Sequence, residues 1–399
     1  MSEFLTLINS FAVIFLLYIF RRRIKILIAK KSYSYFKKLP VNGKRAIFSS
    51  FSGKAFSDSP KYLYLECQQK YPDIECIWVV DDLNIEIPGN ATKVKNMSFK
   101  HFYYMATSKY WIFNARIPAM FTKREEHVYL QTWHGTPLKK LGLDMDVAYF
   151  ATANYKHNFY KNAQRWDYLV SANSFSSKVF PSAFGVDKDI ILEYGYPRND
   201  ILINHTENDI AKIKKDLKLD DTKKVILYCP TWRDDQKKAS KDYGFNLKMD
   251  LKSLKDKFGS DAVILLRMHY LIAENIDLTG VEDFAFDVSN YPDIQELYII
   301  SDVMITDYSS TMFDYSILKK PVILYTYDLD KYKDVLRGFY FDLLELSPGP
   351  IVIEQSELEN KIEKGLSGEL NYNEAFYNKF CLTDKGTASQ SILEKLFLN

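Results

Sequence analysis

Two histidines and three arginines in this sequence are of the right type to act on a phosphorylated ligand. His134 lies in the sequence WHGTP directly after an apolar run, and His269 follows Arg267 after another. Arg198 and Arg233 also come shortly after apolar runs. Histidine can take up or release a proton near neutral pH, and the planar fork of arginine donates two hydrogen bonds to one phosphate. Together these residues predict an anion site that contains a proton-transferring group.

A pair of serines predicts a second part of the same site. Ser309 and Ser310 follow the apolar run Val303–Thr306, and a helical pattern resumes at Met312. Hydroxyls and unpaired backbone N–H groups at the start of a helix suit a phosphate. The alternative is that Asp307 or Ser309 only caps the helix.

Five polar clusters in all follow predicted strands, and in a parallel sheet such clusters meet in one cleft. They are His134 with Gly135 and Thr136, Arg198, Pro230 and Thr231 with Arg233, Arg267 with His269, and Asp307 to Ser310. Plainer interpretations exist for each. A histidine at a strand end is often structural, and Arg233 or Arg267 could form a surface ion pair. Asp314 could be a surface carboxylate, although it lies one helical turn after Ser310 and could face the same ligand.

The elements that would position these clusters alternate between strands and helices, which predicts an α/β fold with parallel, doubly wound sheets. Predicted strands are Arg45–Phe51, Ile74–Val80, Trp111–Asn114, Tyr129–Thr132, Asp167–Ala172, Ile190–Tyr194, Lys224–Cys229, Ala262–Arg267, Phe284–Val288, Val303–Thr306 and Pro321–Tyr325. The main predicted helices are Tyr62–Lys70, Tyr103–Tyr110, Glu207–Lys218, Leu251–Phe258, Ile294–Ile300, Glu354–Lys364 and Ser389–Phe397. We expect an N-terminal segment over 1–40 and two Rossmann-like domains over 41–206 and 207–399.

Composition narrows the function classes. The chain has 399 residues and 47% hydrophobic content, which is enough for two cores. A net charge of +2 predicts no nucleic-acid partner. The four cysteines are scattered, which argues against a disulfide framework or zinc site and fits a reducing cytosol. No P-loop, dinucleotide-binding, zinc-protease or esterase motif is present.

The N-terminus predicts membrane association. Phe4–Phe20 is nearly continuous apolar sequence, and Arg21, Arg22, Arg23 and Lys25 follow it. This order is the reverse of a signal peptide. A short transmembrane anchor or an interfacial helix would fit, and in both cases the basic residues favour anionic lipid on the cytoplasmic face of the cell membrane. The alternative is a core helix of a soluble domain.

Several segments, taken in order, resemble one family. They are QTWHGTPLKKLG (131–142), GYPRND (195–200), YCPTWRD (228–234), RMH (267–269), SDVMITDYSSTMFDY (301–315), PVILYTYDLDKY (321–332) and RGFYFD (337–342). Together they resemble the CDP-glycerol glycerophosphotransferases of teichoic acid and related polymer synthesis. The resemblance covers roughly Arg45 to Leu393, and the ordered set is highly specific although each segment alone is weak.

The resemblance implies a GT-B-like fold, in which two Rossmann-like domains face each other across a cleft. It implies transfer of glycerol phosphate from CDP-glycerol, the donor, to a hydroxyl of an undecaprenyl-diphosphate-linked acceptor, with release of CMP. His134 would be the general base, and His269 would contact the donor phosphates or protonate the leaving group. The resemblance implies that the donor is bound by Gly135, Thr136, Pro137, Leu138, Arg198, Pro230, Thr231, Arg267, Met268, Ser309, Ser310 and Asp314. The polar clusters add Arg233 and Asp307 to the candidate binding residues. Tyr270 departs from the pattern, because proline is the more frequent residue there.

Some alternatives stay open at this point. The donor could be CDP-ribitol, and a GT-B glycosyltransferase using a nucleotide sugar or an inactive membrane scaffold would share much of the pattern. The short chain slightly favours a primase-like or short-chain enzyme over a polymerase, and a capsule polymer is an alternative product. A divalent metal would suit a diphosphate donor, but no carboxylate cluster requires one.

Overall fold

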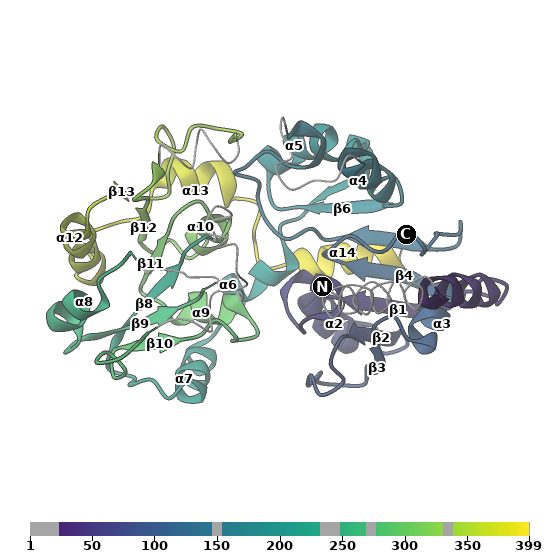
Figure 1. Cartoon of the computed structure of the whole chain (residues 1–399), viewed down its shortest axis with the longest axis horizontal. Coiled ribbons are helices and arrows are strands. Elements are labelled where there is room, and N and C mark those ends of the chain that lie inside the picture. The colour runs from purple at the N-terminus through teal and green to yellow at the C-terminus, as the bar shows by residue number, and fades with distance from the viewer. Residues whose placement is uncertain (1–23, 146–153, 232–247, 269–276, 330–337, 399) are drawn as a thin grey trace, which may run out of the picture. The chain divides into compact units, whose positions relative to one another are not determined.

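A computed structural model describes the chain except for residues 1–23, 146–153, 232–247, 269–276, 330–337 and 399. Its strands form a seven-stranded sheet, β1 to β7, and a six-stranded sheet, β8 to β13 (Figure 1). The chain divides into two compact units: Met1–Phe56 with Tyr64–Leu130, and Ser57–Leu63 with Gln131–Asn399. The predicted α/β fold with two parallel sheets is confirmed, and the domain boundaries at 40 and 206 stay a prediction.

The first unit is built around parallel strands in the order β3-β2-β1-β4. Ala46 of β1 lies opposite Cys76 of β2 and Tyr110 of β4. A helix covers 24–36, and the other elements are β1 Asn42–Ser49, η1 Phe51–Gly53, β2 Glu75–Val80, β3 Thr92–Lys95, α3 Phe99–Thr107, β4 Ser108–Phe113 and β5 Val128–Gln131. Helix α2, Asp58–Lys70, begins in the second unit and ends in the first.

The second unit contains the parallel pair β6 and β7 and the six-stranded sheet in the order β10-β9-β8-β11-β12-β13. Its elements are η2 Gly142–Asp144, α4 Tyr155–Ala163, β6 Tyr168–Ser171, α5 Ser174–Phe184, η3 Lys188–Ile190, β7 Ile191–Glu193, η4 Pro197–Asn199, α6 Asp200–Asn204, α7 Glu207–Asp216, β8 Lys224–Cys229, α8 Leu251–Phe258, β9 Ala262–Leu266, β10 Ala285–Asp287, α9 Ile294–Ile300, β11 Val303–Thr306, α10 Thr311–Ser316, β12 Val322–Tyr325, β13 Ile351–Val352, α12 Gln355–Leu366, α13 Glu374–Phe380 and α14 Ala388–Phe397.

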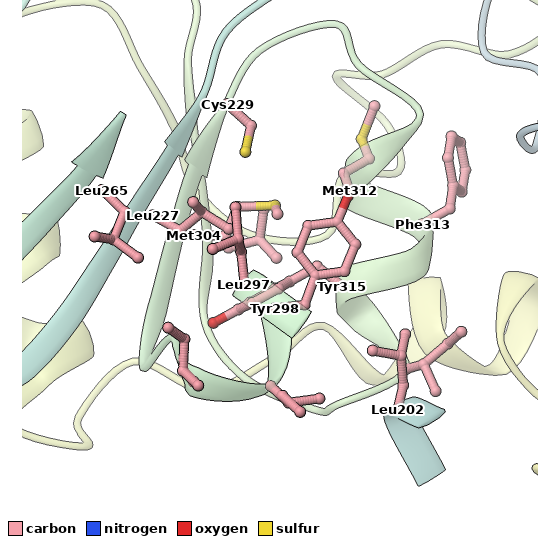
Figure 2. Packing of buried hydrophobic residues seen from close by; sticks show 14 of the residues in the cluster. Leu202, Leu227, Cys229, Leu265, Leu297, Tyr298, Met304, Met312, Phe313 and Tyr315 are labelled. Carbon is pink, nitrogen blue, oxygen red and sulfur yellow. The ribbon is translucent and has the colours of Figure 1, made fainter. Parts of the chain in front are cut away.

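The six-stranded sheet is buried on both faces, which is why its strands are continuously apolar rather than alternating. Leu227, Leu265 and Met304 pack with helices α9 and α10 on one face (Figure 2). The neighbouring residues Ile226 and Ile264 belong to the other face, where side chains of α8 and α12 cover them. Each such buried side chain contributes roughly 1.5–3 kcal/mol, so the ends of β8, β9 and β11 are held firmly.

Several elements differ from the sequence prediction. The predicted helix Tyr103–Tyr110 is wrong at both ends, because α3 runs from Phe99 to Thr107 and strand β4 starts at Ser108. Strands β3 and β13 were not predicted. Strand β3 has the sequence TKVK with one buried residue, and β13 has two residues, so neither has a recognisable apolar pattern.

The predicted membrane segment Phe4–Phe20 lies outside the described residues. The helix over 24–36 is described, and it exposes Ile24, Leu27 and Ile28 while burying Ala29 and Tyr33. Within the described part of the chain, no helix has both the length and the apolar character that crossing a membrane requires.

Candidate functional site

The candidate base His134 follows an unusual turn at the end of β5. Trp133 has a φ of 54°, in the left-handed region that bulky residues rarely adopt. Its buried ring lies 4.7 Å from the ring of Phe184 and stacks 4.4 Å from the imidazole of His134, between centroids. The imidazole is exposed. Packing therefore holds a strained turn that leaves His134 exposed.

The next residue, Gly135, lies directly against the serine pair. A β-carbon built on Gly135 would stand 2.8 Å from the Ser310 Oγ and 3.0 Å from the Ser310 Cβ. Real side chains do not approach so closely, so only glycine permits this contact. The two predicted parts of the site, the turn with His134 and the turn with Ser309 and Ser310, are thus adjacent.

The rest of the HGTPL segment is buried and anchors the turn. The Thr136 hydroxyl accepts a 3.1 Å hydrogen bond from the side-chain amide of Asn173. Leu138 belongs to the core, and its carbonyl accepts a 2.8 Å bond from the Tyr340 N–H. Pro137 is also buried. Thr136, Pro137 and Leu138 therefore anchor the turn in the interior. Their predicted contact with substrate stays a prediction.

Capping explains only part of the segment before α10. The Ser309 hydroxyl accepts a 3.3 Å bond from the Thr311 N–H, whereas the Ser310 side chain makes no capping bond. Both serines are half-buried. Since the capping bond of Ser309 is long, both hydroxyls keep capacity for a ligand.

Asp307 braces two neighbouring strand ends. Its buried carboxylate accepts hydrogen bonds from the Thr231 N–H at 2.8 Å and from the Thr231 hydroxyl, and from the Tyr308 N–H at 2.6 Å. Asp307 therefore fixes the turn after β8 to the turn after β11. Pro230 and Thr231 are half-buried beside it.

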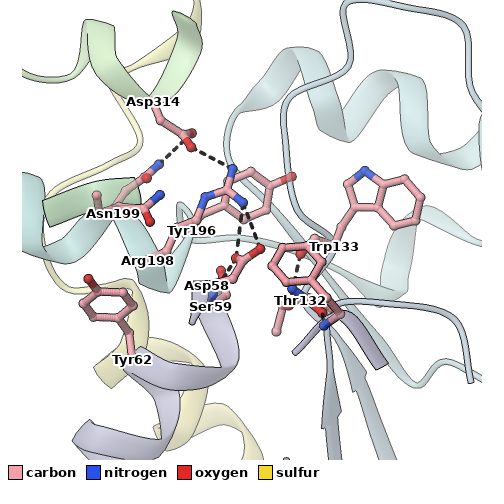
Figure 3. Close-up of polar contacts among 12 residues, drawn as sticks. Asp58, Ser59, Tyr62, Thr132, Trp133, Tyr196, Arg198, Asn199 and Asp314 are labelled. Atoms are coloured by element: carbon pink, nitrogen blue, oxygen red, sulfur yellow. Dashed lines mark hydrogen bonds and ion pairs between the residues drawn. The ribbon is translucent and has the colours of Figure 1, made fainter. Parts of the chain in front are cut away.

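Arg198 is buried between two carboxylates (Figure 3). Its Nη2 donates to Asp314 at 2.7 Å, and its Nη1 donates to Asp58 at 3.2 Å. Burial lowers the pKa of Arg198, but the two carboxylates raise it more, and the net pKa lies above the ordinary value. Burial raises the pKa of Asp314, and Arg198 opposes that shift. Asp314 is thus no surface carboxylate.

Among the described residues no carboxylate pairs with Arg267, and its guanidinium binds the backbone instead. Its Nη1 donates to the carbonyls of Val288 at 2.7 Å, Ser289 at 2.5 Å and Tyr291 at 2.6 Å. Burial lowers the pKa of Arg267. The N–H of Met268 donates to the Ser289 hydroxyl at 3.0 Å. Both residues thereby fix the loop after β10.

Two predicted site residues, Arg233 and His269, lie outside the described residues. The site as described therefore brings together Gly135, Ser310, Arg198 and Asp314, while Thr231 and Arg267 stand at the ends of strands β8 and β9 of the same unit.

Three further residues emerge only from the structure: Trp133, Asn173 and Asp58. The side-chain oxygen of Asn173 caps α5 by accepting a 2.9 Å bond from the Ser176 N–H, but no sequence pattern predicts the bond from its amide nitrogen to Thr136. In the sequence, Asp58 is recognisable only as a polar residue near the start of a predicted helix. Long-range partners such as Arg198 cannot be inferred from the local pattern around it.

The carboxylates at the site do not form a metal-ligand set. Asp307 faces backbone and hydroxyl donors, and Asp314 faces Arg198. Over the described ranges, no three His, Cys, Asp or Glu side chains are grouped so as to hold a metal ion.

Comparison with known proteins shows which family this chain is similar to. The family model described as CDP-Glycerol:Poly(glycerophosphate) glycerophosphotransferase matches residues 31–398. A teichoic acid poly(glycerol phosphate) polymerase of Staphylococcus epidermidis is 48% identical over 362 residues, which are 88% of this chain and 50% of that protein. The chain thus spans about half the length of that relative. A teichoic acid glycerol-phosphate transferase of Staphylococcus aureus is 46% identical, over 94% of this chain and 99% of that protein.

Comparison with solved structures leads to the same family. A variant of the wall teichoic acid polymerase TagF that was soaked with CDPG has a TM-score of 0.87 and 44% identity, and the match covers 95% of this chain and 96% of that chain. The UDP-GlcNAc 2-epimerase of Methanocaldococcus jannaschii, at 13% identity and a TM-score of 0.55, shares only the fold. The chain therefore belongs to the CDP-glycerol:poly(glycerophosphate) glycerophosphotransferase family.

Proposed function

We propose that this chain transfers glycerol phosphate from CDP-glycerol to a hydroxyl of a lipid-linked acceptor and releases CMP, in teichoic acid or related cell-surface polymer synthesis. The observation that carries the proposal is the contact between Gly135 and Ser310, which places a histidine turn beside a pair of hydroxyls in a member of this family. A base beside phosphate-binding donors is what phosphoryl transfer requires.

In the proposed reaction, His134 takes the proton of the acceptor hydroxyl, and the acceptor oxygen attacks the β-phosphorus of CDP-glycerol in line. The bond from that phosphorus to the bridging oxygen breaks, and CMP leaves with the electron pair. The hydroxyls of Ser309 and Ser310 and the guanidinium of Arg198 would stabilise the charge on the phosphoryl oxygens. His269 would contact the donor phosphates or protonate the departing CMP.

Glycerol is the favoured donor unit over ribitol. The relatives named for glycerol phosphate polymerase or transferase activity are 41–48% identical to this chain, whereas those named for ribitol phosphate are 24–26% identical. The glycerol-phosphate primases, at 28–29%, are also more distant. These identities favour extension of an existing glycerol phosphate over a primase-like reaction.

The acceptor, the GT-B-like cleft and the membrane contact also belong to the proposal. The helix over 24–36 exposes Ile24, Leu27 and Ile28 beside Lys25, which suits an anionic membrane surface on the cytoplasmic face. An undecaprenyl-diphosphate-linked acceptor would be presented at that surface. Sedimentation with vesicles of anionic and of neutral lipid tests this contact.

The decisive experiment measures CMP release by the purified protein. CDP-glycerol, CDP-ribitol and UDP-sugars are each offered with undecaprenyl-diphosphate-linked saccharides, and the products are weighed by mass spectrometry. We expect release from CDP-glycerol and products heavier by whole glycerol phosphate units. A parallel reaction with EDTA, which removes divalent cations, tests whether CMP release depends on a divalent metal. Release only from a UDP-sugar would contradict the proposal.

A further inference from the structure

The first turn of helix α2 carries a carboxylate that the proposed reaction does not use. Asp58 is 4% exposed and has a φ of 58°, in the left-handed region. Its carboxylate accepts the N–H of Ser59 and both Nη1 bonds of Arg198, at 3.2 and 3.3 Å. A strained backbone that holds a buried carboxylate against a buried guanidinium points to a specific role for that carboxylate.

Three side chains hold the guanidinium of Arg198 in place (Figure 3). Asp58 binds Nη1, Asp314 binds Nη2, and the ring of Tyr196 lies 4.8 Å from the guanidinium carbon. Nη2 also lies 4.0 Å from the position of a β-carbon on Gly135. Asp58 thus sets the orientation of a guanidinium that borders the His134 turn.

The α2 turn is itself anchored, so that Asp58 is a fixed point. The ammonium of Lys61 pairs with Asp293 at 2.6 Å and with Glu296 at 3.1 Å. The hydroxyl of Tyr62 donates to the same Asp293 carboxylate at 2.8 Å. Since these contacts lie within one compact unit, Asp58 cannot swing away from Arg198 without breaking them.

The charges around Arg198 distinguish a role of Asp58 in orienting the guanidinium from a role in folding. Asp314 alone neutralises Arg198, so removing the charge of Asp58 leaves no unpaired cation in the interior. Asp58 is therefore not required for neutrality. What it adds is a second, opposed hydrogen-bond partner, which fixes the guanidinium plane.

We propose that Asp58 is a positioning residue for Arg198 and, through it, for the donor phosphates. The proposal rests on the proposed function, because Arg198 is the residue that would meet the donor. Asp58→Asn keeps the size of the side chain and an oxygen that can accept the Ser59 N–H, but it weakens the hold on Nη1. We expect this variant to lose about 10- to 100-fold in kcat/KM for CDP-glycerol, consistent with one lost charged hydrogen bond.

The test is a double-mutant cycle in the full chain with Asp58→Asn, Arg198→Lys and both together. If Asp58 acts through Arg198, Asp58→Asn has little further effect on kcat/KM once Arg198 is lysine. The control is Asp250→Asn, whose exposed carboxylate caps α8 by accepting bonds from the N–H groups of Lys252 and Ser253, which are not among the site residues that the structure describes. It should keep wild-type kcat/KM.

The outcomes separate the two proposals. A wild-type protein that releases no CMP from CDP-glycerol overturns the proposed function, whereas an active wild type with an equally active Asp58→Asn overturns the positioning role. Additive losses in the cycle also overturn it. Urea unfolding of the same four proteins measures the coupling of Asp58 to Arg198 without substrate, and absence of coupling there would contradict the contact itself.

Discussion

The side-chain amide of Asn173 donates both to the Thr136 hydroxyl, at 3.1 Å, and to the Phe380 carbonyl, at 2.9 Å. One buried amide thus joins the turn of the candidate base to the end of α13. Its oxygen at the same time caps α5 by accepting the Ser176 N–H.

Asn173→Ala should destabilise the protein and lower activity. The cap contributes about 1 kcal/mol, and the buried carbonyl and hydroxyl left unpaired cost roughly 1–3 kcal/mol more. Urea unfolding measures the loss. The matched control is Asn373→Ala, which removes the cap of α13 and a 2.9 Å bond to the Ser347 carbonyl away from the site. Both should lose stability, and equal kcat/KM losses would contradict a specific role for Asn173.

Gly135→Ala should lower kcat/KM by at least about tenfold, because the new methyl group would lie 2.8 Å from the Ser310 Oγ. The two turns must then separate. The double variant with Ser310→Gly removes the opposing side chain and should recover part of the stability lost by Gly135→Ala. Gly43→Ala is the control, since a β-carbon there meets nothing within 4 Å. Full activity of Gly135→Ala would show that the contact is unimportant.

His134→Gln should reduce kcat by about 10²- to 10⁴-fold, the usual contribution of a general base, while the Kd for CDP-glycerol stays the same. Calorimetry and single-turnover CMP release measure the two quantities. His157→Gln, on the exposed surface of α4, is the control. If weaker donor binding accounted for the whole loss in His134→Gln, the role as base would be wrong.

The free energy of unfolding should fall as the pH drops from about 6.5 to about 4. Burial lowers the pKa of His101 to about 3 and that of His127 to about 4. In the unfolded chain both titrate near 6.5, so over this range the unfolded state binds protons that the folded state does not. Each imidazole contributes on the order of 1–3 kcal/mol to the loss.

Urea unfolding at a series of pH values measures this dependence. His127→Phe keeps a ring beside Trp111, whose centroid lies 4.6 Å from that of His127, and removes one titrating group. Its stability should vary less with pH than that of the wild type. An unchanged slope would mean that another group is responsible.

The sequence predicted the strand ends well because their signals are local. Val303–Thr306 and Ile294–Ile300 have the predicted bounds, since a continuous apolar run or a capped apolar helix is visible within a few residues. The polar residues after such runs could be assigned to the edge of a sheet on the same grounds.

The contacts of the site could not be predicted in the same way. The pairing of Asp307 with Thr231 and of Arg198 with Asp58 joins residues that are far apart along the chain. The left-handed turn at Trp133 has no sequence signal at all, because tryptophan is a poor residue for that conformation. Tertiary packing decides these features.

Helix α2 has a practical consequence for dissecting the protein. Its first residues, 58–63, belong to the unit that also holds Gln131–Asn399, and along the chain the segment Tyr64–Leu130 of the other unit separates the two pieces. No single cut in the polypeptide can therefore release the unit intact. A fragment starting at Gln131 would lack Asp58, Lys61 and Tyr62, whereas supplying α2 as a separate peptide should restore the missing carboxylate.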